Sequence, residues 1–252
     1  MLYDINQLVD YLLEDIQSDE RHGGGPIEHP LQHPDANLDP EMHKRSLEVI
    51  GNEFPDVDPK TVFMHGTDNM YLPHRWRRDE TFMRSGRDAR GALGMSTTPL
   101  LQVASRYAMH PEKGRIILGQ FHQGNAHTFG DPHENPQGSY NEVGRAIRSQ
   151  DVAGIPQPKG GVMLSKHIMA APDDPFEFEA HFKDLSMMQQ KQLGKYQATS
   201  LAKKISDSGK QFAVYAEPVP GHGTVVAPTR LKHFKALGEF GAEDIRKFGL
   251  GR

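Results

Sequence analysis

The chain has 252 residues, with 29 Lys and Arg against 33 Asp and Glu, and its pI is near 6.4. This balance argues against a dedicated nucleic-acid binder, whose surface is normally basic. The 36% hydrophobic content can fill one substantial core, and no apolar run approaches the roughly 20 residues that cross a bilayer. Cysteine is absent, which excludes disulfides and thiolate chemistry. We therefore expect a soluble globular protein with neither nucleic-acid nor membrane partners.

Residues 1–54 are predicted to form a helical segment ahead of the main domain, 55–252. Apolar residues at helical spacing indicate one amphipathic helix over 4–18 and another over Pro40–Glu53. Between them, residues 18–40 are polar and rich in Gly, Pro and His, which is typical of a long loop. The first helix is expected to pack on the core or to bind a partner.

The main domain begins with a short apolar run, Thr61–Met64, which predicts a buried strand between Pro59 and Gly66. His65 follows this run, so its imidazole is expected at a sheet edge. Gly66 has no Cβ and is therefore expected to let a ligand approach the backbone closely. His65, Gly66 and Thr67 form the first candidate motif.

A second strand is predicted over Ala92–Thr97. Thr98 and Pro99 then favour a helix start, because a hydroxyl residue is followed by proline at the first helical position. The helix is expected to run to about Met109. Ser96 and Thr97 are small hydroxyl residues that leave the strand, where they can orient a carboxylate or a sugar. The apolar face of this helix consists of Leu100, Leu101, Ala104, Tyr107 and Ala108.

A third strand is predicted over Ser139–Val143, after a loop of Gly, Pro, His and Asn residues over 124–138. Glu142 enters this strand directly after the loop, so its carboxylate is expected at the rim of a site. Further along, the pattern predicts a half-buried strand over Pro175–Phe182, a helix over Ser186–Ser206 and a strand over Phe212–Ala216.

Over 61–155 these motifs together resemble the ADP-ribosyltransferase superfamily, in the branch of diphtheria-like toxins and poly(ADP-ribose) polymerases. His65-Gly66-Thr67 with Tyr71 is similar to the first strand of that branch and the tyrosine after it. Ser96-Thr97-Thr98 is similar to the Ser-Thr-Ser element of the arginine-type branch. Tyr140-Asn141-Glu142 looks like the strand with the catalytic glutamate. The resemblance implies an α+β fold with a split antiparallel β-sheet and flanking helices.

The resemblance also implies a site for NAD, used as a substrate. No metal site is expected, because no His-x₃-His or His-Glu-x-x-His pair occurs with a carboxylate nearby on a regular element. Glu142 would be the catalytic carboxylate, and Ser96 would steady it. His65 would bind the adenosine ribose, and the Gly66 backbone would hold the nicotinamide amide. Tyr71 and Tyr107 would stack on the two faces of the nicotinamide ring. The implied catalytic residues are His65, Ser96 and Glu142. The implied NAD-binding residues are His65, Gly66, Thr67, Tyr71, Ser96, Thr97, Tyr107 and Tyr140.

The sequence departs from the family pattern in two places. Met95 stands next to Ser96, where the histidine-containing branch usually has an aromatic residue. Tyr140, two residues before Glu142, replaces the Glu or Gln that accompanies modification of arginine, asparagine or cysteine in other branches. The acceptor therefore does not follow from the motif. Glu177-Phe178-Glu179 is a second candidate for the catalytic carboxylate.

The chemistry explains why a carboxylate is needed. Cleavage of the bond between nicotinamide and ribose builds positive, oxocarbenium-like charge on the sugar, as in glycoside hydrolysis. A preorganised carboxylate stabilises that charge more in the transition state than in bound NAD.

The sequence thus predicts a mono-ADP-ribosyltransferase that moves ADP-ribose from NAD to a protein or another macromolecule. The alternatives are an NAD glycohydrolase and a non-catalytic module that binds an NAD-like ligand or a protein. The resemblance implies a bacterial toxin or effector, with or without an activating partner. The N-terminus lacks the basic and apolar regions of a secretory signal. We expect secretion by a non-classical route and action in the cytoplasm of a target cell, or otherwise a cytoplasmic protein.

Overall fold

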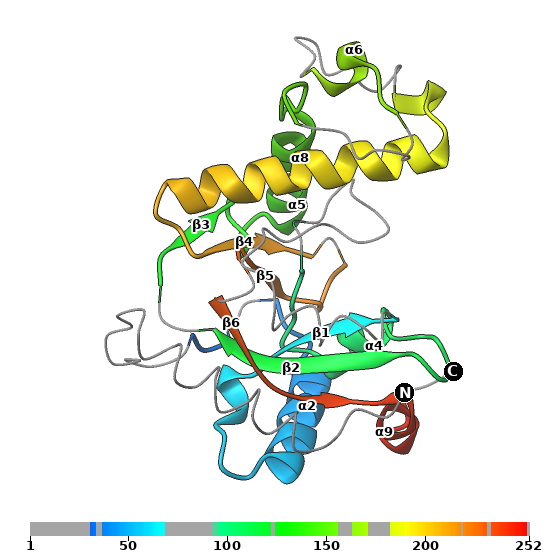
Figure 1. Cartoon of the computed structure of the whole chain (residues 1–252). Coiled ribbons are helices and arrows are strands. Elements are labelled where there is room, and N and C mark those ends of the chain that lie inside the picture. Colours follow the sequence, from blue (N-terminus) through cyan, green and yellow to red (C-terminus); the bar gives the residue numbers. More distant parts are fainter. Residues whose placement is uncertain are drawn as a thin grey trace, which may run out of the picture.

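The computed structural model describes residues 31–33, 37–68, 93, 95–121, 124–155, 163–170, 182–217, 219–230 and 233–250. Helices and strands both occur in these ranges, so the predicted α+β class is confirmed (Figure 1). Some predictions lie wholly or mostly outside the described residues. They are the helix over 4–18, the loop over 18–40, Tyr71, Glu177-Phe178-Glu179, and all but the last residue of the strand over Pro175–Phe182.

The strands form two small sheets. The first is antiparallel in the order β1-β2-β6, with β1 at Phe63–Thr67, β2 at Arg115–Phe121 and β6 at Phe234–Phe240. The second has the order β3-β4-β5, with β3 at Ala126–Thr128, β4 at Phe212–Ala216 and β5 at Thr224–Pro228. Strand β3 is parallel to β4, and β5 is antiparallel to it. The second sheet is therefore mixed, whereas the resemblance implied an antiparallel one.

Two residues connect the sheets. Thr98 exchanges backbone hydrogen bonds of 2.8 and 2.9 Å with Met64 of β1. Its neighbour Thr97 exchanges bonds of 3.0 and 3.2 Å with Val226 of β5. Thr97 and Thr98, at the end of the predicted second strand, thus lie between β5 and β1, and Ser96 directly precedes them.

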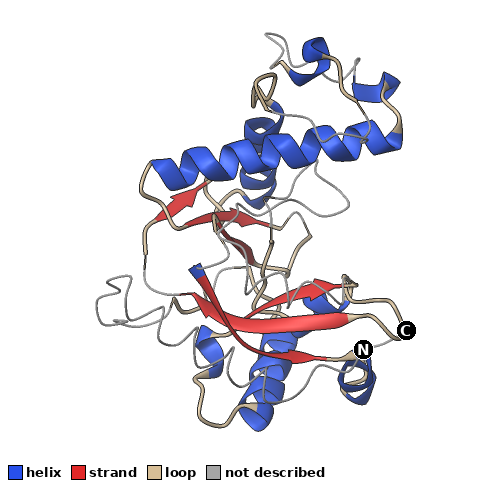
Figure 2. Ribbon diagram, in the orientation of Figure 1, coloured by secondary structure: helices blue, strands red, loops and turns tan. Residues whose placement is uncertain are grey.

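Helices cover the outer face of each sheet, so the strands form the two inner layers (Figure 2). The first sheet packs on α2 (Pro40–Glu53), α4 (Leu101–Ser105) and α9 (Ala242–Lys247). The second sheet packs on α5 (Pro136–Arg148) and α8 (Met187–Asp207). Two further short helices of the described residues are η1 (Pro59–Thr61) and α6 (Lys166–Met169).

An aromatic core fills the space between the sheets. The ring of Phe121 makes edge contacts with Phe63 at 5.1 Å and with Phe234 at 4.9 Å, measured between centroids. Phe212, from the second sheet, lies 5.7 Å from the same ring. Edge contacts of this kind add to the hydrophobic gain from burial. Phe121 therefore joins the inner faces of both sheets.

Side-chain caps fix the starts of the main helices. The Asp39 carboxylate accepts the Met42 amide at the start of α2, which begins at Pro40 as predicted. Asn135 caps α5 in the same way through the Gly138 amide, at 2.9 Å. Such caps satisfy amide groups that have no partner within the helix.

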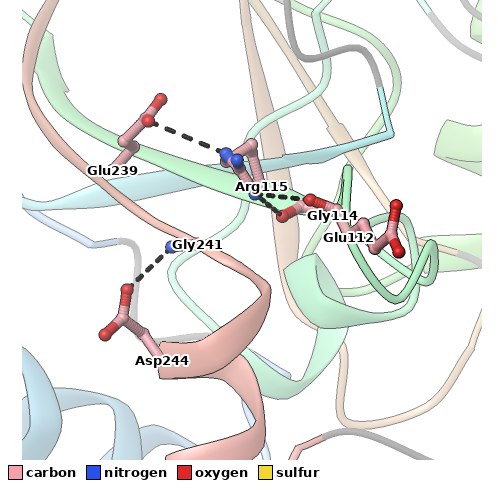
Figure 3. A network of polar contacts seen from close by, with 6 residues as sticks. All are labelled: Glu112, Gly114, Arg115, Glu239, Gly241 and Asp244. Carbon is pink, nitrogen blue, oxygen red and sulfur yellow. Dashed lines mark hydrogen bonds and ion pairs between the residues drawn. The ribbon is translucent and has the colours of Figure 1, made fainter.

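A polar network fixes the turn before β2 against the end of β6 (Figure 3). Arg115 donates from Nη1 to the carbonyls of Glu112 at 3.2 Å and Gly114 at 2.9 Å. Its Nε lies 3.7 Å from the Glu239 carboxylate. The carboxylate of Asp244 accepts the Gly241 amide at 2.8 Å, where α9 starts. The Arg115–Glu239 contact joins β2 to β6, and the Asp244 cap fixes the start of α9 directly after β6.

Two strand predictions are wrong. Ser139–Val143 lies within helix α5, and the described part of Ala92–Thr97 makes only the isolated bridge at Thr97. In α5, Ser139, Val143 and Ile147 are buried at a spacing of four residues, which is the helical period. The helix predicted to reach Met109 ends at Ser105.

Candidate functional site

His65 lies on the inner face of the first sheet, in the same strand as the core residue Phe63. Its Nδ1 is 2.9 Å from the Ser96 carbonyl oxygen. A carbonyl only accepts hydrogen bonds, so Nδ1 carries the proton. Burial lowers the pKa of His65, and the bond to Ser96 opposes that shift. The ring is therefore neutral at pH 7, which makes Nε2 a hydrogen-bond acceptor.

Ser96 also bonds a buried tyrosine. Its Oγ lies 2.8 Å from the hydroxyl of Tyr215, at the end of β4. Burial raises the pKa of Tyr215, so the phenol stays protonated. Glu217 and Tyr140 lie close enough to disfavour its ionisation further. The structure thus brings His65, Ser96 and Tyr140 to one place, together with two residues that the sequence analysis did not predict.

Glu217 supplies a carboxyl group to the site formed by His65, Ser96 and Tyr215. It directly follows β4, is half-buried, and donates its backbone N–H to the Gly223 carbonyl at 3.0 Å. Burial raises the pKa of Glu217, and the positive charge of Arg106 opposes that shift. The sequence contained a signal for Glu217: an acidic residue directly after a predicted strand and before a run of Pro and Gly.

A tight turn follows Glu217. The His222 amide donates to the Val219 carbonyl at 3.1 Å, and Gly221 between them has φ of 80°. Pro220 followed by a glycine with positive φ is the signature of a type II turn. The turn folds His222 inward, where only 4% of its surface is exposed.

Arg106 connects this turn to helix α4. Its Nη1 lies 3.0 Å from Nε2 of His222. A guanidinium only donates, so Nε2 accepts and the proton of the ring is on Nδ1. Burial and the charge of Arg106 both lower the pKa of His222. His222 is therefore neutral at pH 7.

Gly66 has a different role from the one expected. A Cβ at this position would overlap the backbone carbonyl of Ala104 and lie 3.1 Å from Cβ of Tyr107. The glycine therefore allows helix α4 to pack against β1, and the side that a Cβ would occupy is filled by the chain itself.

The other predicted NAD-binding residues differ in their surroundings. Thr97 is buried and donates from Oγ1 to the Val226 carbonyl, so its hydroxyl is used in joining the sheets. Tyr107 is 60% exposed rather than part of a buried helix face. Thr67 ends β1 opposite Arg115. None of these observations tests NAD binding, which stays a prediction.

Glu142 is exposed on helix α5. One of its carboxylate oxygens would lie 3.1 Å from a Cβ built on Gly130, beyond β3. The strand on which its catalytic assignment depended is a helix, because Asn135 and Pro136 start α5 upstream of it. Glu142 therefore lacks the setting that the resemblance implied.

Within the described ranges, no three His, Asp or Glu residues gather that could hold a metal ion. None of the described helices is both long and apolar enough to cross a membrane. No family model matches the chain, and no curated protein or solved structure matches it. The chemistry of His65, Ser96, Tyr215 and Glu217 is therefore the basis on which a function is proposed.

Proposed function

We propose that the protein is a transferase that moves ADP-ribose from NAD to a macromolecular acceptor and releases nicotinamide. The observation that carries the proposal is Glu217, a half-buried carboxyl group near the hydroxyl of Tyr215. That hydroxyl bonds Ser96, and the Ser96 carbonyl in turn bonds His65. Glu217 takes the role that the sequence resemblance suggested for Glu142.

The surroundings of Glu217 suit the stabilisation of positive charge. A carboxylate acts more strongly on a developing cation where water is partly excluded, because the local dielectric constant is lower. Burial already disfavours its charged form before substrate binds, and Arg106 partly offsets this. Oxocarbenium-like charge on the ribose would remove that penalty, so the stabilisation would be greatest in the transition state.

His65 and Ser96 have supporting roles in this proposal. The neutral His65 ring presents Nε2 as an acceptor, which suits a ribose hydroxyl. Ser96 bonds His65 through its carbonyl and Tyr215 through its hydroxyl, so it fixes both side chains. Action as a bacterial effector inside a target cell, delivered by a non-classical route, belongs to the same proposal and depends on the sequence resemblance.

The test is nicotinamide release from NAD by the purified protein and by Glu217→Gln, with and without a eukaryotic lysate containing labelled NAD. Glu217-dependent label on a lysate protein is the expected result. Glu217-dependent release without label would identify an NAD glycohydrolase instead. NAD binding without turnover, in both conditions, would contradict the enzymatic proposal and identify a binding module.

A further inference from the structure

The partner of Arg106 distinguishes it from other arginines of the chain. Arg115 pairs with a carboxylate, Glu239, at 3.7 Å, and Arg246 donates to the Pro111 carbonyl at 2.9 Å. Arg106 is exposed, and its Nη1 donates to the Nε2 of neutral His222 at 3.0 Å. In the described part of the chain, no carboxylate oxygen lies within the 4.0 Å of an ion pair with it.

This arrangement leaves the positive charge of Arg106 available. A guanidinium has five N–H donors in a planar fork that matches phosphate and carboxylate oxygens. A neutral imidazole orients the fork through one donor but does not neutralise it. Glu217 acts on Arg106 only through space, without an ion pair.

The position of Arg106 is fixed from two sides. It caps α4, and the Ala104 carbonyl of this helix packs on Gly66, next to His65. His222 is buried by the type II turn. The neighbouring Gly221 carbonyl accepts the Asp39 amide at 2.8 Å. The end of α4 fixes the backbone of Arg106, and one hydrogen bond to a buried ring orients its guanidinium, which reduces the entropy that binding would cost.

We propose that Arg106 binds a phosphate group of the substrate and that His222 positions the guanidinium for this contact. The identity of the substrate as NAD rests on the proposed function, whereas the recognition of a phosphate group does not. Arg106 is a binding residue here, and His222 is a positioning residue.

The first test uses steady-state kinetics with NAD and calorimetry with ADP-ribose. Arg106→Gln should raise KM for NAD and Kd for ADP-ribose on the order of 10- to 100-fold, because a pair of charge-assisted hydrogen bonds to a phosphate is lost. Because the phosphates do not react, kcat should change less than about threefold at alkaline pH, where Glu217 is ionised with or without the charge of Arg106. Arg246→Gln is the matched control, since it removes an exposed arginine on α9, and both constants should stay unchanged.

His222 provides the second test. His222→Gln keeps an acceptor for Arg106, whereas His222→Phe removes it and fills a similar volume. We expect His222→Phe to raise KM and Kd towards the values of Arg106→Gln, and His222→Gln to stay close to wild type. A merely structural role would instead lower the fraction of active protein and leave KM unchanged.

The outcomes separate this proposal from the proposed function. Arg106-dependent binding of ADP-ribose without nicotinamide release would support the phosphate site and contradict the transferase. Nicotinamide release with an unchanged KM and Kd in Arg106→Gln would overturn the phosphate site alone. A loss of kcat at constant KM would also overturn it, because it would place Arg106 with Glu217 in the chemical step.

Discussion

Ser96 bonds two functional side chains at once, and this was only partly predictable. Its type and position suggested that it orients a carboxylate or a sugar, and the resemblance gave it Glu142 as a partner. In the structure its carbonyl oxygen instead lies 2.9 Å from Nδ1 of His65. Its bond to Tyr215 joins residues far apart in the sequence, and no local pattern predicts such a pair. Glu217 did have a local signal, since it directly follows a predicted strand, but that signal did not reveal that its neighbours in space are Arg106 and Tyr215.

The neutral state of His65 has a consequence for stability. An unfolded histidine has a pKa of about 6.5, and burial lowers the pKa of His65 in the folded protein. Below about pH 6.5 the unfolded chain therefore takes up a proton that the folded chain does not. The free energy of unfolding decreases as the pH is lowered from about 6.5 to the pKa of the folded protein. Above about pH 6.5 this group has no effect.

His65→Gln should remove this effect. We expect the free energy of unfolding of the wild type to fall more between pH 7.5 and pH 5.5 than that of the variant, measured by urea denaturation at both values. Equal losses in the two proteins would show that His65 is not held neutral.

Gly66 is predicted to be intolerant of a side chain for a reason of packing. Gly66→Ala would overlap the Ala104 carbonyl, so α4 would have to move away from β1. Overpacking of this kind typically costs about 1–3 kcal/mol. Gly154→Ala is the control, because a Cβ there meets nothing within 4 Å. Urea midpoints that are equal for the two variants would contradict the account.

At the scale of elements, local signals predicted α2 and β4 with the bounds that the structure has. The helix over Ser186–Ser206 is confirmed as α8, Met187–Asp207. The strand predicted over Ser139–Val143 is part of helix α5, and the four-residue spacing of Ser139, Val143 and Ile147 is the sequence signal that favours the helix. The cap at Asn135 was a helix signal present in the sequence.

The turn that carries His222 depends on Gly221. A non-glycine residue at its φ of 80° is strained by about 1–2 kcal/mol. The free energy of unfolding of Gly221→Ala should therefore be lower than that of the wild type by about this amount, measured by urea denaturation. Gly221→Asn introduces the same Cβ near Asp39, but asparagine tolerates positive φ better. The asparagine variant should therefore be the more stable of the two. The reverse order would contradict the turn geometry.

At the scale of the whole molecule, the two sheets meet around Phe121, and this contact was not predictable from the sequence. Phe63, Phe212 and Phe234 come from three different strands, and their approach depends on long-range strand pairing. The sequence predicted buried strands, but it did not specify which strand faces would meet.

Phe121→Ala should be the most destabilising of the substitutions considered. Removal of a buried phenylalanine typically costs about 3–5 kcal/mol, because transfer energy is lost and a cavity remains. Met109→Ala is the control, since Met109 is 63% exposed and its loss should cost no more than about 0.5 kcal/mol. Similar urea midpoints would show that the two sheets do not depend on this ring.

The central claim is that Glu217, and not Glu142, is the carboxylate of the site. Its most direct test is the rate of nicotinamide release from saturating NAD by Glu217→Gln and by Glu142→Gln, two proteins with the same chemical change. We predict a loss of about 10²–10³-fold in Glu217→Gln and a change of less than about twofold in Glu142→Gln. The reverse, a strong loss in Glu142→Gln with Glu217→Gln close to wild type, would contradict the account.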